Sequence, residues 1–116
     1  PLFISNDVVR QAPLVKTVPL AVYNNDYLQT LKKMFVNQTE KIPHGSKLLM
    51  FTDGLSEATR NNEKMEMFEG HGLSEAIKEY QALRPEEFVR GVYGRLCEFR
   101  GSETFDDDIC IICAEV

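Results

Sequence analysis

Three aspartates in two short stretches are the residues best suited to chemistry in this sequence of 116 residues. Asp53 ends the apolar run at residues 48–51 within "LLMFTDGLSEAT", and Asp107 and Asp108 precede the apolar run that closes the chain. A carboxylate is costly to bury without a hydrogen-bond donor or a cation as its partner. Carboxylate oxygens are preferred ligands of hard divalent cations such as Mg²⁺ and Mn²⁺, so these strand ends are candidate metal ligands.

The two apolar runs are expected to position the aspartates as buried strands at residues 47–52 and 109–114. Successive strand residues point to opposite faces of a sheet. In the second run the two faces carry Ile109, Ile111 and Cys113 on one side and Cys110, Ile112 and Ala114 on the other. Both faces of each run are apolar, which predicts central strands covered on both sides, as in a sandwich. If the strands pair antiparallel, Asp53 and Asp107 meet at one edge of the sheet, where a cation would offset their repulsion.

A structural interpretation of the same residues stays open at this point. Asp-Gly after a strand is a common turn, and consecutive aspartates often cap or solvate a loop. The spacing of Cys110 and Cys113 could indicate zinc or redox chemistry, but no second cysteine pair accompanies them. A buried structural role is therefore expected for both cysteines.

The remaining elements predict an α+β fold. Leu73, Ile77 and Tyr80 are spaced at a helical period, and Ser74 is a candidate N-cap for this helix. A second helix is expected over residues 85–100, with a first-turn proline, a stripe of apolar residues and a glycine after its end. Residues 27–38 are expected to form a strand, residues 24–26 a turn, and residues 14–23 an edge strand or extended connection broken by a proline. No βαβ alternation is present, which favours layers around a mostly antiparallel sheet.

Composition limits the classes of partner. The net charge of −5 disfavours nucleic acid, because phosphate binding needs clustered lysine and arginine. No apolar run approaches the roughly 18 residues of a membrane span. Three cysteines are too few for a disulfide framework, so a reducing, cytoplasmic location is expected. The chain starts at Pro1, which is expected to reflect a fragment of a longer protein.

Taken together, "LLMFTDGLSEA" and "DDDICIIC" resemble the C-terminal half of the metal-dependent protein phosphatases of the type 2C class. The bacterial SpoIIE/RsbU-like branch is the nearest in pattern. The intervening "MFEGHGLSEAI" and "RPEEFVRGVYGRLCEF", and the earlier "PLFIS" and "VPLAVY", also resemble segments of that branch. The resemblance therefore spans the whole chain.

The resemblance implies part of an αββα sandwich and hydrolysis of phosphoserine or phosphothreonine with two Mn²⁺ or Mg²⁺ ions. It carries the metal-ligand role over to Asp53 and Asp107, and a supporting role behind the ligands to Gly54 and Asp108. Asp106 is expected to belong to a loop, and Glu57 to order its loop through a hydrogen bond. Such chemistry needs no nucleophilic side chain, because metal-bound water attacks the phosphorus.

Two departures from the pattern bear on function. Cys110 stands where relatives have a hydroxyl residue, and the N-terminal half of the domain, with the remaining metal carboxylates, is absent from the chain. Residues 1–116 are thus expected to be the C-terminal portion of one phosphatase domain and inactive alone. The alternative is a phosphatase-like interaction module without catalysis. A calcium-stabilised loop would need more oxygen ligands than the three aspartates supply.

The resemblance also implies partners. It points to a phosphorylated signalling protein as substrate, such as an anti-sigma-factor antagonist, and to an upstream sensor or receiver domain. Association with a second copy of the chain is a further expectation. Neither nucleic acid nor a membrane is expected as a partner.

Overall fold

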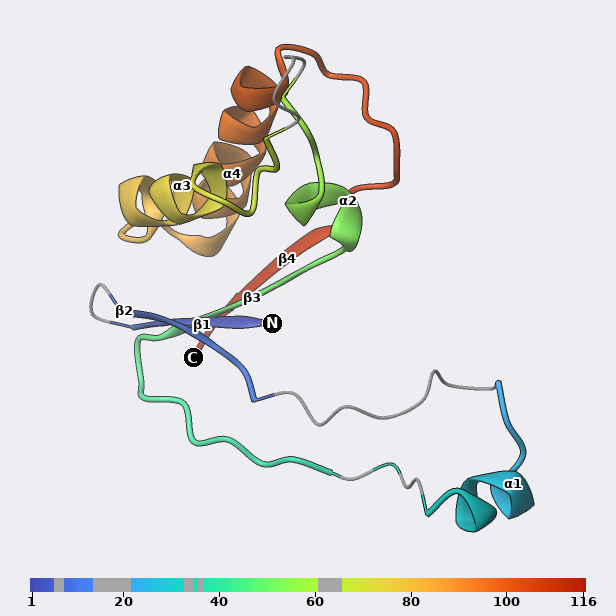
Figure 1. Ribbon diagram of the computed structural model, residues 1–116. Helices are drawn as coiled ribbons and strands as arrows, with labels where there is room; N and C mark the ends of the chain where they lie inside the picture. Colours follow the sequence, from blue (N-terminus) through green and yellow to red (C-terminus); the bar gives the residue numbers. More distant parts are fainter. Residues whose placement is uncertain (6–7, 14–21, 33–34, 36, 61–65) are drawn as a thin grey trace. The chain divides into compact units, whose positions relative to one another are not determined.

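The computed structural model describes residues 1–5, 8–13, 22–32, 35, 37–60 and 66–116. These residues divide into two compact units, one comprising residues 1–11 and 42–116 and the other residues 12–41. The first unit holds the sheet and three helices (Figure 1), and its residues include all of the aspartates singled out above. Within the described residues, no helix is both long and apolar enough to cross a membrane.

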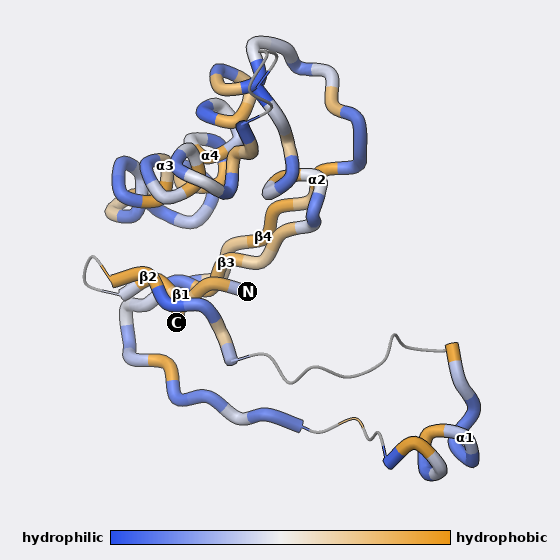
Figure 2. Tube along the Cα trace, viewed as in Figure 1, coloured by the Kyte–Doolittle hydropathy of each residue, from blue (hydrophilic) through white to orange (hydrophobic). Residues whose placement is uncertain are grey.

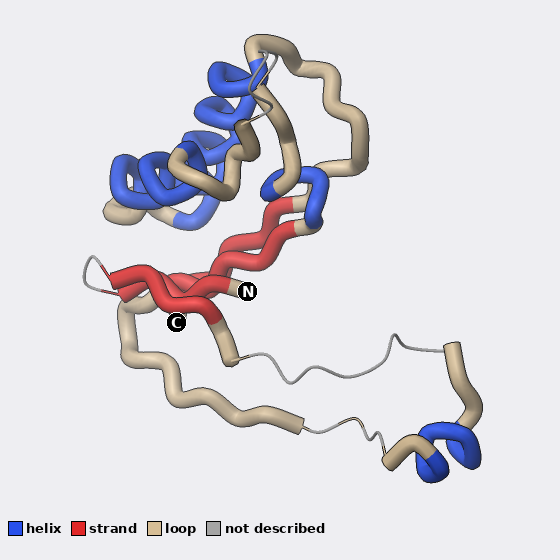
Figure 3. Tube along the Cα trace, in the orientation of Figure 1, coloured by secondary structure: helices blue, strands red, loops and turns tan. Residues whose placement is uncertain are grey.

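Four antiparallel strands, coloured red in Figure 3, form the sheet of the first unit, and their order is β2-β1-β3-β4. The strands are β1 (Leu2–Ser5), β2 (Val8–Gln11), β3 (Lys47–Phe51) and β4 (Ile111–Glu115). β3 and β4 pair from Lys47 opposite Glu115 to Phe51 opposite Ile111. The expected α+β class and the antiparallel pairing of the two apolar strands are therefore confirmed. β4 begins two residues later than expected, and it lies at an edge of the described sheet instead of at its centre.

Three helices accompany the sheet: α2 (Asp53–Ser56), α3 (Gly72–Tyr80) and α4 (Pro85–Arg100). α4 has the expected bounds, because Pro85 suits a first turn and Gly101 ends the helix in the left-handed conformation at φ 74°. α3 begins earlier than Ser74, with His71 as its N-cap. The Ser74 hydroxyl instead donates to the His71 carbonyl at 3.0 Å, so the predicted capping role of Ser74 is wrong.

Residues of α3, α4 and one face of the sheet form most of the core, and Figure 2 shows hydrophobic stretches along these segments. α4 contributes the fully buried stripe of Phe88, Val92 and Leu96, at the helical spacing expected from the sequence. Leu49 of β3 is equally buried beneath it. The full buried cluster is Ile4, Leu49, Leu55, Ala58, Phe68, Leu73, Ala76, Ile77, Phe88, Val92 and Leu96.

The opposite face of the sheet is open among the described residues. Met50 is 38% exposed and its cross-strand partner Ile112 is 50% exposed, and Ala114 is also exposed. Within the described residues of the first unit, the expectation that both strands are covered on both faces is therefore wrong. The apolar alternation is present, but the helices of the first unit cover one face only.

The second unit contains α1 (Asn25–Thr30), where the sequence predicted a turn at residues 24–26 and a strand over residues 27–38. Both predictions are wrong over the described part of these ranges. The Asn24 side chain accepts the Tyr27 N–H at 2.8 Å as a helix N-cap, and Asp26 occupies the favourable first turn. Local capping therefore outweighs the weak strand alternation. The expected edge strand at residues 14–23 falls almost entirely outside the described residues.

Candidate functional site

Thr52 joins the end of β3 to the segment that precedes β4. Its backbone N–H donates to the Cys110 carbonyl at 3.1 Å, which extends the strand pairing one residue beyond β3. Its hydroxyl donates to the Asp108 carbonyl and accepts the Cys110 N–H, each at 3.0 Å. These three bonds hold Asp53, the next residue, beside the segment that carries Asp107 and Asp108.

Gly54 allows a close backbone approach at the same place. It is buried, and a Cβ atom on it would lie 2.5 Å from the Asp108 carbonyl oxygen and 3.3 Å from that of Asp107. Since real Cβ contacts do not reach 2.5 Å, any larger residue would push the two segments apart. Glycine is needed here for space and not for an unusual backbone angle.

The two candidate carboxylates are similarly arranged. Asp53 is the first residue of α2, and its Oδ1 accepts the Gly54 N–H at 3.1 Å. Asp107 Oδ1 accepts the Asp108 N–H at 2.8 Å. Both aspartates are exposed, so these local bonds orient each carboxylate while solvent still reaches it.

A small cavity of about 130 Å³ adjoins these segments, lined by Gly54, Glu57, Ala58, Arg100, Phe105, Asp106 and Asp107. Arg100, at the end of α4, has a side chain that is only 17% exposed. Its guanidinium pairs with the Asp106 carboxylate at 2.8 Å and donates to the Thr59 carbonyl at 3.2 Å and hydroxyl at 3.3 Å. Arg100 thus connects the helix to two different loops beside the aspartates.

The structure brings the sequence-predicted residues Asp53, Gly54, Asp107 and Asp108 to one end of the β3–β4 pair. Asp106 belongs to a loop, as expected, but it is also held in an ion pair. Across the part of the chain that the structure describes, no group of three or more acidic, histidine or cysteine side chains could hold a metal by itself.

Sequence reasoning missed two residues of this site: Thr52, for which no separate signal stood out, and Arg100. The available signal for Arg100 was a lone arginine in the last helical turn, six residues before a run of three aspartates. The expected burial of Cys110 is also wrong, because this side chain is exposed whereas Cys113 packs against the core.

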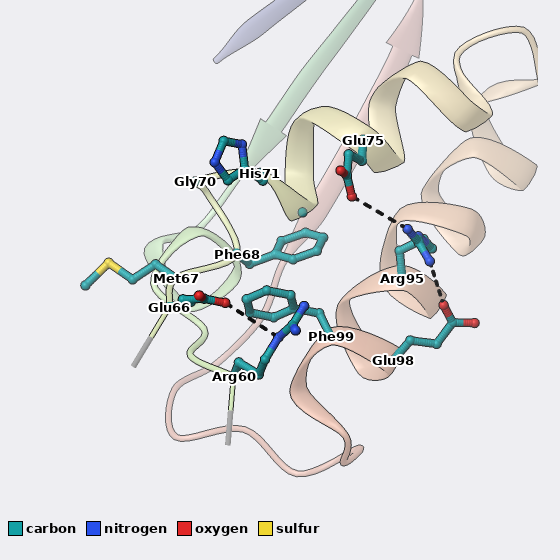
Figure 4. Close-up of a pocket in the computed structure, with 11 residues that line it drawn as sticks. Arg60, Glu66, Met67, Phe68, Gly70, His71, Glu75, Arg95, Glu98 and Phe99 are labelled. Carbon is teal, nitrogen blue, oxygen red and sulfur yellow. Dashed lines mark hydrogen bonds and ion pairs between the residues drawn. The ribbon is translucent and has the colours of Figure 1, made fainter. Parts of the chain in front are cut away.

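A larger cleft of about 590 Å³ lies at the α3–α4 side of the first unit (Figure 4). Its two arginines are paired with acidic side chains: Arg95 contacts Glu75 at 3.8 Å and Glu98 at 3.1 Å, and Arg60 contacts Glu66 at 3.9 Å. The hydrogen bond to Glu98 raises the pKa of Arg95. This cleft includes none of the aspartates that approach one another at the strand ends.

Comparison with known protein families shows which family the chain belongs to. The model of the family described as stage II sporulation protein E (SpoIIE) matches residues 1–116. The chain belongs to the SpoIIE family. The SpoIIE family is phosphatase-related, with a function of the signal-transduction type, and it generally uses divalent metals. No curated protein and no solved structure matched the chain.

Proposed function

We propose that this SpoIIE-family chain is the C-terminal portion of a protein phosphatase domain that hydrolyses phosphoserine or phosphothreonine on a signalling protein. One observation carries the proposal: Thr52 and Gly54 hold the backbones of Asp53 and Asp107–Asp108 against each other at one end of two paired strands. Such close approach is expected where carboxylates from two segments bind the same cation.

The donor chemistry fits hard divalent cations. The exposed side chains at this strand end offer carboxylate oxygens, with neither histidine nor cysteine among the proposed ligands, which suits Mg²⁺ or Mn²⁺. When bound, two such ions lower the pKa of a water molecule and offset charge on the phosphoryl oxygens. The remaining carboxylates would come from the residues that precede Pro1 in the complete domain.

Each residue of the chain has a distinct part in this proposal. Asp53 and Asp107 hold the cations through their carboxylates. Gly54 permits the close contact between the two segments, and Asp108 supports the ligands through the carbonyl that Thr52 binds. Oriented ligands lose less freedom on binding a metal, which is why such supporting contacts affect metal affinity.

The proposed substrate is a phosphorylated protein such as an anti-sigma-factor antagonist, under control of an upstream sensor or receiver domain in the cytoplasm. The open face of the sheet supports the proposal of a larger domain, because exposed apolar patches usually have a partner. The preceding half of an αββα sandwich, or a second copy of the chain, would cover this face. A phosphatase-like interaction module without activity is the second candidate.

The proposal is tested in a protein extended upstream of Pro1 to the complete domain. Mn²⁺ should support phosphate release from phosphoserine peptides, and chelation should abolish it. Asp53→Asn and Asp107→Asn keep the side-chain shape but remove the charge that binds the cation. Each should lower kcat/KM by roughly 100-fold or more and weaken Mn²⁺ binding, while circular dichroism stays unchanged.

Glu87→Gln is the matched control, because Glu87 is exposed in the first turn of α4, at the opposite end of that helix from Arg100, and its loss should leave activity unchanged. Equal hydrolysis with both Asp53 and Asp107 neutralised would show that the metal assignment is wrong. Mn²⁺ binding without phosphate release in the unsubstituted protein would favour the interaction module. The chain of 116 residues alone should be inactive throughout.

A further inference from the structure

We infer that Arg100 is a positioning residue that sorts the three consecutive aspartates, holding Asp106 in an ion pair so that Asp107 is left to bind the cation. The inference rests on the proposed metal-dependent function. It adds a residue from α4, outside both aspartate motifs, to the machinery that sets metal affinity.

Three adjacent carboxylates can compete for the same cation. Asp106, Asp107 and Asp108 are all exposed and lie on one irregular segment between α4 and β4. A cation near this segment could recruit any of the three, and only one arrangement preserves the approach to Asp53. A fixed partner for one aspartate removes that competitor and anchors the segment at the same time.

Arg100 has the contacts that such sorting requires. Its guanidinium lies 2.8 Å from Asp106 Oδ2, and a second nitrogen donates to both oxygens of Thr59 at 3.2 and 3.3 Å. The Asp106 side chain is 82% exposed, so this ion pair, and not burial, sets its position. Asp107 lines the same small cavity as Arg100 and follows Asp106 directly, so its backbone position depends on the anchored residue.

The contact pattern requires arginine and not only a positive charge. A planar guanidinium can bind Asp106 and Thr59 at the same time with different nitrogens, whereas a lysine ammonium is a single point charge on a flexible stem. Since the Arg100 side chain is mostly buried, its position is also fixed by packing. Arg100 therefore connects α4 to the loop at Thr59 and to the aspartate segment.

Mn²⁺ affinity of the extended protein, measured from the electron paramagnetic resonance signal of free Mn²⁺, distinguishes positioning from simple electrostatics. Removing a positive charge near a cation site should tighten Mn²⁺ binding if only the local field matters. If Arg100 sorts the aspartates, Arg100→Met should instead weaken binding by about 10-fold, the size typical of lost supporting contacts. Arg100→Lys keeps the charge and should be intermediate, whereas the field alone predicts no change.

Arg90→Met is the matched control on the same helix. Arg90 pairs with Glu86 at 2.7 Å, and both side chains are largely exposed, so Mn²⁺ affinity should stay unchanged. In the double variant Arg100→Met with Asp106→Asn, the two effects should be less than additive, because each change breaks the same ion pair.

Tighter or unchanged Mn²⁺ binding in Arg100→Met would overturn the inference, as would an Arg100→Lys variant that binds like the unsubstituted protein. A lower Tm with unaltered Mn²⁺ affinity would mean that Arg100 is only structural. Asp107→Asn distinguishes failure of the positioning role of Arg100 from failure of the proposed metal site. If Asp107→Asn weakens Mn²⁺ binding and Arg100→Met does not, the sorting role fails alone; if Asp107→Asn has no effect, the proposed metal site fails with it.

Discussion

Both faces of the β3–β4 pair carry apolar residues, but one face is buried and the other is exposed. On one face, Leu49 is fully buried beneath the apolar stripe of α4. On the other, Met50 and Ile112 pair across β3 and β4 and remain 38% and 50% exposed. Hydrophobicity alone therefore does not distinguish the face that this chain covers from the face that it leaves open.

The difference shows what kind of unit the chain is. Eleven buried residues from α2, α3, α4, the loops beside them and one sheet face form a single core, so this half of the proposed sandwich is well packed. The open face has the composition of an interior without a second layer. A sheet with two apolar faces needs layers on both sides, which is the physical reason to expect further sequence or a partner.

The largest expected effect compares one residue from each face. Leu96→Ala removes a fully buried side chain and should lower the free energy of unfolding of the chain by about 2–5 kcal/mol. Ile112→Ala, on the open face, should cost less than about 1 kcal/mol in the same chain, because little area is lost from the interior. Urea denaturation followed by circular dichroism measures both.

In the extended protein the difference should shrink, since a second layer over the open face would bury Ile112. An Ile112→Ala cost that stays below about 1 kcal/mol there would mean that the upstream residues do not cover this face. A large Ile112→Ala cost in the chain of 116 residues alone would contradict the openness of the face itself.

Much of this arrangement was predictable from the sequence. The helix at Pro85–Arg100 was predicted with the right bounds, because its proline, first-turn acids and terminal glycine act locally. The antiparallel pairing of the two apolar strands was also predicted. The failure at α1 has a local cause too, the capping side chain of Asn24, which was interpreted as a turn. The exposure of one sheet face was not predictable from the pattern of apolar residues. This pattern shows which side chains face each side of the sheet, but not whether another layer packs on that side.

The site shows the same division between local and tertiary information. Asp53 and Asp107 could be singled out from their places at the ends of apolar runs. The role of Gly54 as a point of close approach depends on Asp108, a residue 54 positions away in the chain, and no local pattern encodes that contact. Arg100 was missed for the same reason, since its contacts with Thr59 and Asp106 exist only after folding.

The next largest expected effect is a difference in stability between alanine substitutions at two glycines. Gly54→Ala places a methyl group against the Asp108 carbonyl and should destabilise the chain by about 1–3 kcal/mol, as overpacking does. Gly94→Ala is the matched control within α4, where a Cβ meets nothing within 4 Å. This change should be neutral or stabilising by up to about 1 kcal/mol, because alanine favours a helix over glycine.

Thermal unfolding of both glycine variants measures the difference. In the extended protein, Gly54→Ala should also weaken Mn²⁺ binding, because it separates the two aspartate segments, whereas Gly94→Ala should not. Equal stability of the two variants would show that the strand ends approach less closely than the contact at Gly54 requires.

The smallest expected effect is a difference in alkylation rate between two cysteines, which does not involve protein stability. Strand alternation places these cysteines on opposite faces of the sheet. Cys110 is exposed and shares the side of Ile112, whereas Cys113 packs against the core. Burial, with a smaller contribution from Glu115, raises the pKa of the Cys113 thiol, against the opposing effect of Lys47. Since the thiolate is the reactive form, Cys113 should be less ionised than an unperturbed thiol at pH 8. Cys110 should therefore react with iodoacetamide at least about 10-fold faster, as peptide mass spectrometry would show.

The pH dependence separates ionisation from access. With a raised pKa, the rate at Cys113 should keep increasing above the pH at which an ordinary thiol is fully ionised. In urea at unfolding concentrations the two cysteines should react at similar rates, because both the burial and the neighbouring charges are lost. Equal rates in the folded chain would contradict the assignment of the two residues to opposite faces. In the extended protein, slower alkylation of Cys110 would identify the open face as the surface that the second layer covers.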